Sequence, residues 1–215
     1  MKKIKASLII NILIVFLVIL ATVFLLTDFN FMPVKKLLIV EGMDNFKFYT
    51  VDSNLLLAVT SLVLAIYELK LKKGKIKEIP NKIYLLKMVG TSAITLTFII
   101  TLFFLAPSSG FYGLYNNSGL LYHMIVPLLA LISYIFLEKH DNKYKYAFLG
   151  VIPMFLYALY YVPNVILHKS ELVSYDFYNF LRGDYSNIYY TIPVLFLMGY
   201  LISILIIFAN KKFAK

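Results

Sequence analysis

The stretch that decides the fold is SLIINILIVFLVILATVFLLT, which runs from Ser7 to Thr27 without a charged side chain. A helix rises about 1.5 Å per residue, so about 20 apolar residues cross a hydrocarbon core about 30 Å thick. A helix also satisfies its own backbone hydrogen bonds, as a single segment in lipid must. We therefore predict a transmembrane helix here. Three lysines precede it, as in a signal peptide, but its length and the lack of a small-residue cleavage site favour a retained anchor.

Five further apolar stretches of similar length follow along the chain. Together with a hydrophobic content of 61% and a mean hydropathy of +0.80, they exceed what one soluble core can hide. We predict an all-α polytopic bundle of six transmembrane helices, forming one domain over residues 1–215 of a multi-pass cell-membrane protein. The predicted spans are roughly 7–27, 48–67, 83–106, 119–137, 146–167 and 190–209.

Lysine and arginine are distributed unevenly between the two sides of this topology. With the N-terminus in the cytoplasm, 16 of these residues lie on the cytoplasmic side, if Lys87 is counted with the preceding loop. The other side has five: Lys35, Lys36, Lys47, Lys169 and Arg182. Cytoplasmic loops are enriched in Lys and Arg, so we expect both termini to be cytoplasmic.

Composition excludes several classes of function. The formal charge of +10 is scattered between apolar blocks, whereas nucleic-acid binders gather basic groups on one solvated face, so we expect no nucleic-acid partner. The absence of Cys removes disulfides and thiolate chemistry. Only three His are present and the topology separates them, so we expect no His-rich metal centre and no cofactor, while a mixed carboxylate and His site stays open. Among 21 cationic residues all but Arg182 are Lys, a bias typical of an AT-rich bacterial genome.

Polar side chains near the start of two predicted spans lie at matching depth. Residues 48–54 read FYTVDSN, and His123 follows the start of the span 119–137. Both spans enter the membrane from the outer face, so Thr50 and His123 lie at depths that agree within about one turn. Helical spacing puts Ser53 and Asn54 on the stripe of Thr50.

This pairing predicts acyl transfer if the two side chains meet. His123 would act as general base toward the Thr50 hydroxyl, a poor nucleophile until its proton is removed. Asn54 or Ser53 would orient the imidazole or stabilise an oxyanion, and Asp52 would fix the imidazole tautomer. The alternative is structural, because Thr often bonds to its own helix and a bundle His often bonds to a neighbour.

Aromatic residues gather in and after the fifth predicted span. Pro153, Tyr157 and Tyr160 favour either a kinked helix lining a pocket or kinked packing with an interfacial belt. The following segment, residues 175–181 (YDFYNFL), is aromatic enough to lie on the membrane surface as a lid or as an anchor.

Three of these patterns resemble a known family. The segment FYTVDSN (48–54) resembles the Phe-x-Thr-x-x-Ser-Asn opening in bacterial six-helix relatives of the androgen-induced-gene (FAR-type) family. HMIVP (123–127) resembles its His-x-x-x-Pro, and Pro153, Tyr157 and Tyr160 resemble a Pro and Tyr pattern in its fifth span. Animal members hydrolyse fatty-acid esters of hydroxy fatty acids with an intramembrane Thr nucleophile and a His partner. The resemblance implies those roles for Thr50 and His123.

The chain departs from the family after the fifth span. A Tyr-Pro-Tyr-Pro-like turn is expected there, whereas YDFY (175–178) has no proline, so the resemblance does not extend to the substrate lid. The leading hypothesis is an intramembrane lipid esterase, whose partner is a membrane lipid or fatty-acyl ester. The alternatives are a lipid-binding or transport protein that cleaves nothing, and an acyltransferase that uses the same site. A shortage of buried charge is the argument against ion-coupled transport.

Overall fold

The computed structural model describes residues 2–32, 42–168 and 175–214, and over these ranges every regular element is helical. Six helices are long and apolar enough to cross a membrane, which confirms the predicted helical bundle. Most begin or end within a few residues of the predicted bounds. The spans are Lys2–Leu26, Tyr49–Lys72, Asn81–Ser108, Asn117–Leu137, Tyr144–Leu167 and Tyr185–Phe213.

The first three spans are built mainly from regular α-helix. A short 3-10 helix, η1, precedes α2, and the third span leaves α-helical geometry near its end, where the π-helical turn η2 leads into α4. The elements are α1 (Lys2–Leu26), η1 (Gly42–Lys47), α2 (Tyr49–Lys72), α3 (Asn81–Ile100), η2 (Thr101–Leu105) and α4 (Ala106–Ser109).

The fourth and fifth spans are more broken, and the sixth is one long α-helix after a short 3-10 helix. The fourth contains two π-helical turns, a geometry that often marks functional sites in helices. The elements are α5 (Phe111–Leu114), α6 (Asn117–Leu120), η3 (Leu121–Ile125), α7 (Val126–Ile132), η4 (Ser133–Leu137), the 3-10 helix η5 (Tyr144–Val151), α8 (Ile152–Leu167), η7 (Tyr185–Asn187) and α10 (Ile188–Phe213).

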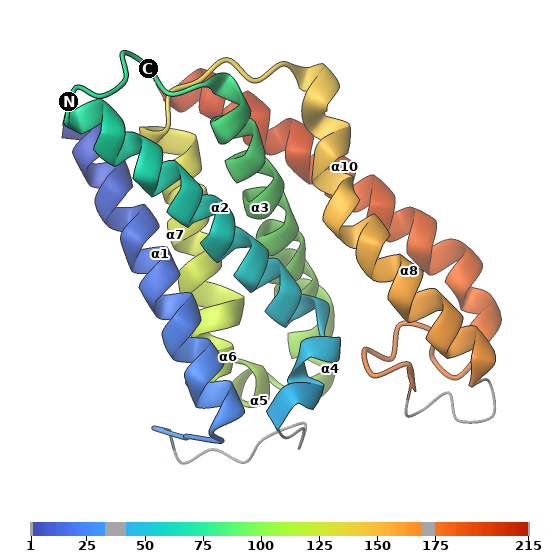
Figure 1. The fold of residues 1–215 in the computed structure, drawn as a ribbon. Helices are drawn as coiled ribbons and strands as arrows, with labels where there is room; N and C mark the ends of the chain where they lie inside the picture. The colour runs from blue at the N-terminus through green and yellow to red at the C-terminus, as the bar shows by residue number, and fades with distance from the viewer. Residues whose placement is uncertain (1, 33–41, 169–174, 215) are drawn as a thin grey trace.

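The bundle has two distinct ends. Both chain termini lie at one end, here called the terminal end, and α4, α5 and α6 lie at the other, here called the distal end (Figure 1). Helix α2 packs against α1 and α3, while α10 packs against α3 and η5. The third span is the most buried of the six, and it therefore forms the centre of the bundle.

Small residues let the helices approach closely. A Cβ atom at Gly150 would overlap the Ser203 hydroxyl, and one at Gly90 would overlap the Thr60 hydroxyl. Ser203 also donates a hydrogen bond to Ser92 in α3 at 3.0 Å. Such contacts are typical of membrane helices, where association relies on packing and hydrogen bonding because lipid is as apolar as the helices.

Candidate functional site

A cavity of about 620 Å³ lies at the distal end of the bundle. Residues from α2, the third and fourth spans, the segment 177–182 and α10 line it, and both Thr50 and His123 are among them. Much of the remaining lining is apolar: Phe48, Ile100, Phe104, Leu105, Leu195 and Met198. The volume and lining are typical of a pocket for a small or lipid-like ligand.

Thr50 is the second residue of α2. The backbone N–H groups of Tyr49 and Thr50 belong to the first helical turn, where no earlier carbonyl of the helix accepts from them. The side chain of Tyr178 reaches this turn, and its hydroxyl lies beside both backbone groups and beside the Thr50 side chain. That hydroxyl is buried and makes no hydrogen bond of ordinary geometry within the described residues. Three donors therefore converge next to the Thr50 hydroxyl.

His123 lies in the π-helical turn η3. Its Nδ1 is 2.9 Å from the Leu114 carbonyl oxygen, and its ring packs edge-on against Tyr115, with centroids 6.1 Å apart. A carbonyl only accepts, so Nδ1 carries the hydrogen of the neutral ring and Nε2 holds the lone pair. The fold thus fixes the tautomer in which the lone pair is on Nε2.

A single buried amide joins the turns that carry these two residues. Asn54 Nδ2 donates to the Thr50 carbonyl at 2.8 Å and to the Tyr122 carbonyl at 3.3 Å. Tyr122 precedes His123 and is held in turn by a 2.6 Å hydrogen bond between its hydroxyl and Thr22 in α1. Thr50 and His123 therefore line one cavity, although no hydrogen bond between them occurs in the described residues.

The other predicted supporting residues lie elsewhere. Ser53 is buried against α3, where its hydroxyl is 2.8 Å from that of Thr97. Asp52 is exposed and lines a second cavity of about 740 Å³, so the partner that fixes the His123 tautomer is the Leu114 carbonyl. Ser53 and Asp52 thus lie away from the imidazole that they were expected to orient.

Tyr157 and Tyr160 line this second cavity together with Pro153. Tyr157 donates to the Lys47 carbonyl at 2.8 Å, and its ring packs 5.2 Å from that of Tyr49, whereas Tyr160 is exposed. Tyr157 also borders a small cavity beside Thr50. These two tyrosines therefore shape the surroundings of α2 but do not line the cavity of His123.

The aromatic segment after the fifth span packs into the bundle. Asp176 accepts from the backbone N–H groups of Phe180 and Leu181 at 3.0 and 2.8 Å, which closes a tight turn. Phe177 packs 5.0 Å from Phe48, and Leu181 is fully buried. This turn brings Tyr178 and Arg182 to the cavity, although sequence reasoning had assigned neither to the site.

Buried charges at the terminal end correct another expectation. Lys87 was counted with a loop, but it lies inside α3 and is completely buried. Glu68 in α2 and Glu138 after η4 are buried as well. The expected shortage of buried charge is therefore wrong.

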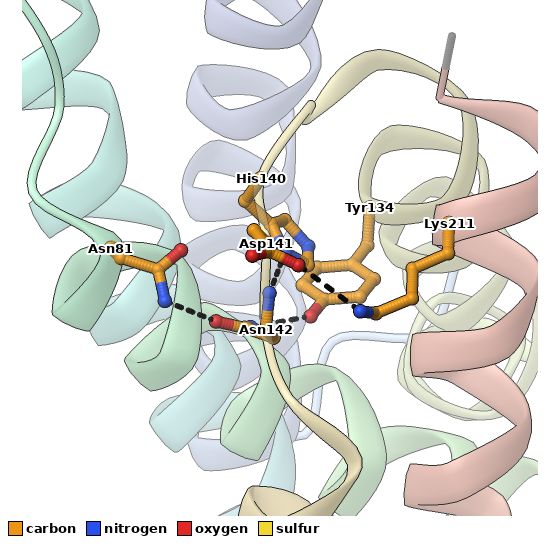
Figure 2. Close-up of polar contacts among 6 residues, drawn as sticks. All are labelled: Asn81, Tyr134, His140, Asp141, Asn142 and Lys211. Carbon is orange, nitrogen blue, oxygen red and sulfur yellow. Dashed lines mark hydrogen bonds and ion pairs between the residues drawn. The ribbon is translucent and has the colours of Figure 1, made fainter.

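A polar network lies beside these charges at the terminal end (Figure 2). Asn142 Nδ2 donates to the Tyr134 hydroxyl at 3.0 Å, Asn81 donates to the Asn142 side-chain oxygen at 3.0 Å, and Lys211 pairs with Asp141 at 3.1 Å. The backbone N–H of Asn142 donates to His140 Nδ1 at 3.2 Å. The network holds the loop after the fourth span against α3 and α10.

No family model, curated protein or solved structure matches the chain. The resemblance to the androgen-induced-gene family therefore stays a prediction that rests on the motif residues alone.

Proposed function

We propose that the chain is an intramembrane lipid esterase that hydrolyses a fatty-acyl ester, with Thr50 as nucleophile and His123 as general base. One observation carries the proposal: both side chains line the same largely apolar cavity, and the hydrogen bond from His123 Nδ1 to the Leu114 carbonyl puts the lone pair of the ring on Nε2. The motif resemblance adds support, because it assigns the same two roles to the same two residues.

The reaction would be an acyl transfer that passes through a covalent intermediate on Thr50. His123 Nε2 takes the hydroxyl proton as the Thr50 oxygen bonds to the ester carbonyl carbon. The carbonyl oxygen becomes an oxyanion, for which the first-turn N–H groups of α2 and the Tyr178 hydroxyl are suitable donors. The ester C–O bond then breaks, and the alcohol leaves with the proton held by His123. His123 then deprotonates a water molecule, which attacks the Thr50 ester. The fatty acid is released, and Thr50 regains its proton from His123.

The cavity lining favours a substrate with one polar part and one acyl part. Arg182, Asn45 and Asn179 contribute polar groups, while Phe104, Leu195 and the other apolar lining residues suit a hydrocarbon chain. The excess of Lys at the terminal end supports a cytoplasmic position for both termini in a cell membrane, and the bias toward Lys over Arg favours a bacterial one. An ester would then reach the cavity from the outer leaflet.

Two other functions use the same cavity. A lipid-binding or transport protein would hold a headgroup there without cleaving it, and the exposed guanidinium of Arg182 favours such headgroup binding. An acyltransferase would form the same Thr50 ester and pass the acyl group to an acceptor other than water. Hydrolysis is preferred because the proposed steps need no acceptor besides water.

The test is hydrolysis of a panel of fatty-acyl esters by the full-length protein in lipid nanodiscs. Thr50→Ala and His123→Gln should each lower kcat/KM by at least about 100-fold, and Thr50→Ser should retain activity. The matched controls Thr27→Ala and His168→Gln alter a Thr and a His that do not line the cavity, and they should behave as wild type. Full hydrolysis by Thr50→Ala would exclude the mechanism, and recovery of intact lipid from an inactive wild type would favour the binding protein.

A further inference from the structure

Three ionisable side chains are buried together at the terminal end of the bundle. Glu68 in α2 is 2% exposed, Lys87 in α3 is 0% exposed and Glu138 after η4 is 1% exposed. They lie within electrostatic reach of one another. None of them lines the cavity of Thr50 and His123. The proposed esterase therefore makes no use of this cluster.

The hydrogen bonds of the cluster come mainly from small polar residues. Lys87 Nζ donates to the Ser61 hydroxyl at 2.6 Å. Glu138 Oε1 accepts from the Ser133 hydroxyl at 2.6 Å and, more weakly, from Asn11 Nδ2 at 3.4 Å. Over the described ranges, no Lys or Arg nitrogen lies within 4.0 Å of either buried carboxylate. The ammonium group is thus close to the two carboxyls without forming a direct pair with either.

Three oxygen atoms in the cluster have no donor. Glu68 Oε2, Glu138 Oε2 and Asn11 Oδ1 are all buried and without a hydrogen-bond partner among the described residues. Asn11 contacts both carboxyl groups, because it lies against Glu68 and donates to Glu138. The Ser7 hydroxyl also lies against Glu68. Ionised carboxylates and an amide oxygen only accept, and among the described residues no side chain donates to these three atoms.

The charges of the cluster also indicate that a proton is missing from it. Two carboxylates and one ammonium leave one negative charge in excess, and an uncompensated charge in a buried membrane site is strongly unfavourable. One proton on a carboxyl would supply both the missing positive charge and the missing O–H donor. A metal cation would supply the charge alone and would be repelled by the Lys87 ammonium.

We propose that Glu68 and Glu138 form a buried proton-binding site in which the two carboxyls share one exchangeable proton and Lys87 balances the remaining negative charge. Binding forms one O–H bond on a carboxylate oxygen and consumes one proton from solvent. The site adds a second activity to the bundle, reversible proton uptake at the end opposite the ester cavity.

The surroundings of the site give it a polar connection toward the surface. Tyr84 in α3 and Tyr134 in η4 both lie within electrostatic reach of Glu138, and Tyr84 also of Glu68. The ring of His140 packs against both tyrosines, with centroids 5.3 and 4.8 Å away. Beyond His140, the Lys211–Asp141 pair lies at the surface (Figure 2). Among the described residues, Tyr84 and Tyr134 are titratable side chains that face the carboxyls, and His140 packs against both tyrosines.

The experiment is infrared spectroscopy of the purified full-length protein in nanodiscs, following the C=O stretching band of protonated carboxyl groups against pH. Wild type should show one buried carboxylic acid at neutral pH that is lost at alkaline pH. Glu68→Gln and Glu138→Gln should each abolish the band at neutral pH, because one carboxylate then balances Lys87. Lys87→Gln should raise the band about twofold, because two carboxyls must then be neutral.

Glu78→Gln alters an exposed carboxyl and should leave the band unchanged. A wild type without the band at neutral pH would overturn the proposal, and so would a band that survives both glutamate substitutions. A thermal midpoint that rises with NaCl but not with choline chloride at equal ionic strength would show that the site takes a metal cation instead, which also overturns it. The wild-type titration and the salt comparison need no variant, so a variant that fails to fold leaves the test intact.

Discussion

The His123 imidazole donates its Nδ1 hydrogen to the carbonyl oxygen of Leu114, at a distance of 2.9 Å. This bond joins η3 to the end of α5 and selects the tautomer with a basic Nε2. The bond requires a glycine at position 119, because the missing side chain of Gly119 leaves room for the Leu114 carbonyl. A Cβ atom at Gly119 would overlap that oxygen and lie 3.6 Å from His123 Nδ1.

Gly119→Ala should therefore displace the Leu114 carbonyl and release the ring. We expect kcat for ester hydrolysis to fall by about 10- to 100-fold, because misplacement of a general base lowers the rate more than it lowers binding. Steady-state kinetics of the purified variant would measure this. Gly199→Ala is the matched control, since its added Cβ would meet its nearest neighbours at an ordinary 4.0 Å. Equal activity of both variants would show that the bond to Leu114 is dispensable.

Asn54 connects the two halves of the candidate site through its amide. Asn54→Ala should lower the free energy of unfolding by about 1–3 kcal/mol, because the buried carbonyls of Thr50 and Tyr122 each lose a donor. Hydrolysis should also fall, since the register of α2 against η3 is no longer fixed. Thermal unfolding and kcat/KM should be compared with Asn164→Ala, which removes an exposed amide bonded within its own helix. A stable but inactive Asn54→Ala variant would assign Asn54 a direct role in the reaction.

Hydrophobicity alone predicts the number of spans, and topology predicts that Thr50 and His123 share a depth. Both predictions depend on local composition and on chain direction, which the sequence contains explicitly. The burial of Glu68, Lys87 and Glu138 depends instead on how α1 and η4 cover the ends of α2 and α3. The sequence does not show whether a charged residue near a Lys-rich helix end faces solvent or a buried side chain such as Asn11.

The positions of Tyr178 and Arg182 at the cavity were not predicted, for a related reason. Their segment reaches the cavity because Asp176 closes a turn, which places aromatic side chains against Phe48. Sequence showed an aromatic segment but not the direction in which it folds. The π-helical turn at His123 was likewise not predicted, because its residues have the composition of ordinary transmembrane helix.

Tyr178→Phe separates a catalytic hydroxyl from a packing ring. Burial raises the pKa of the Tyr178 hydroxyl, which keeps it protonated and able to donate to an oxyanion. We expect kcat to fall by about 10- to 100-fold with little change in KM. The thermal midpoint should change little, because the ring that packs against Phe48 is kept. Tyr175→Phe, in the same segment, should retain kcat. Unchanged kcat in Tyr178→Phe would leave oxyanion stabilisation to the α2 backbone.

His140 gives the fold a dependence on acid. Burial, with the nearby Lys211 ammonium, lowers the pKa of His140 to about 4. The ring is held neutral, because its Nδ1 accepts the backbone N–H of Asn142 and has no room for a proton there. An unfolded chain binds a proton on this residue below about pH 6.5, while the folded protein does so only near pH 4. Stability should therefore fall as the pH drops through this window, by up to about 3 kcal/mol.

His140→Asn should remove this part of the acid sensitivity, because an Asn side-chain oxygen can still accept the Asn142 N–H and does not titrate. The measurement is the thermal midpoint of wild type and variant from pH 7 to pH 4, with His168→Asn as the control. The thermal midpoint of His140→Asn, relative to that of wild type, should rise steadily as the pH drops from about 6.5 to about 4. Since Glu68 and Glu138 are unchanged in both proteins, parallel curves for wild type and variant would show that His140 is protonated without cost to stability.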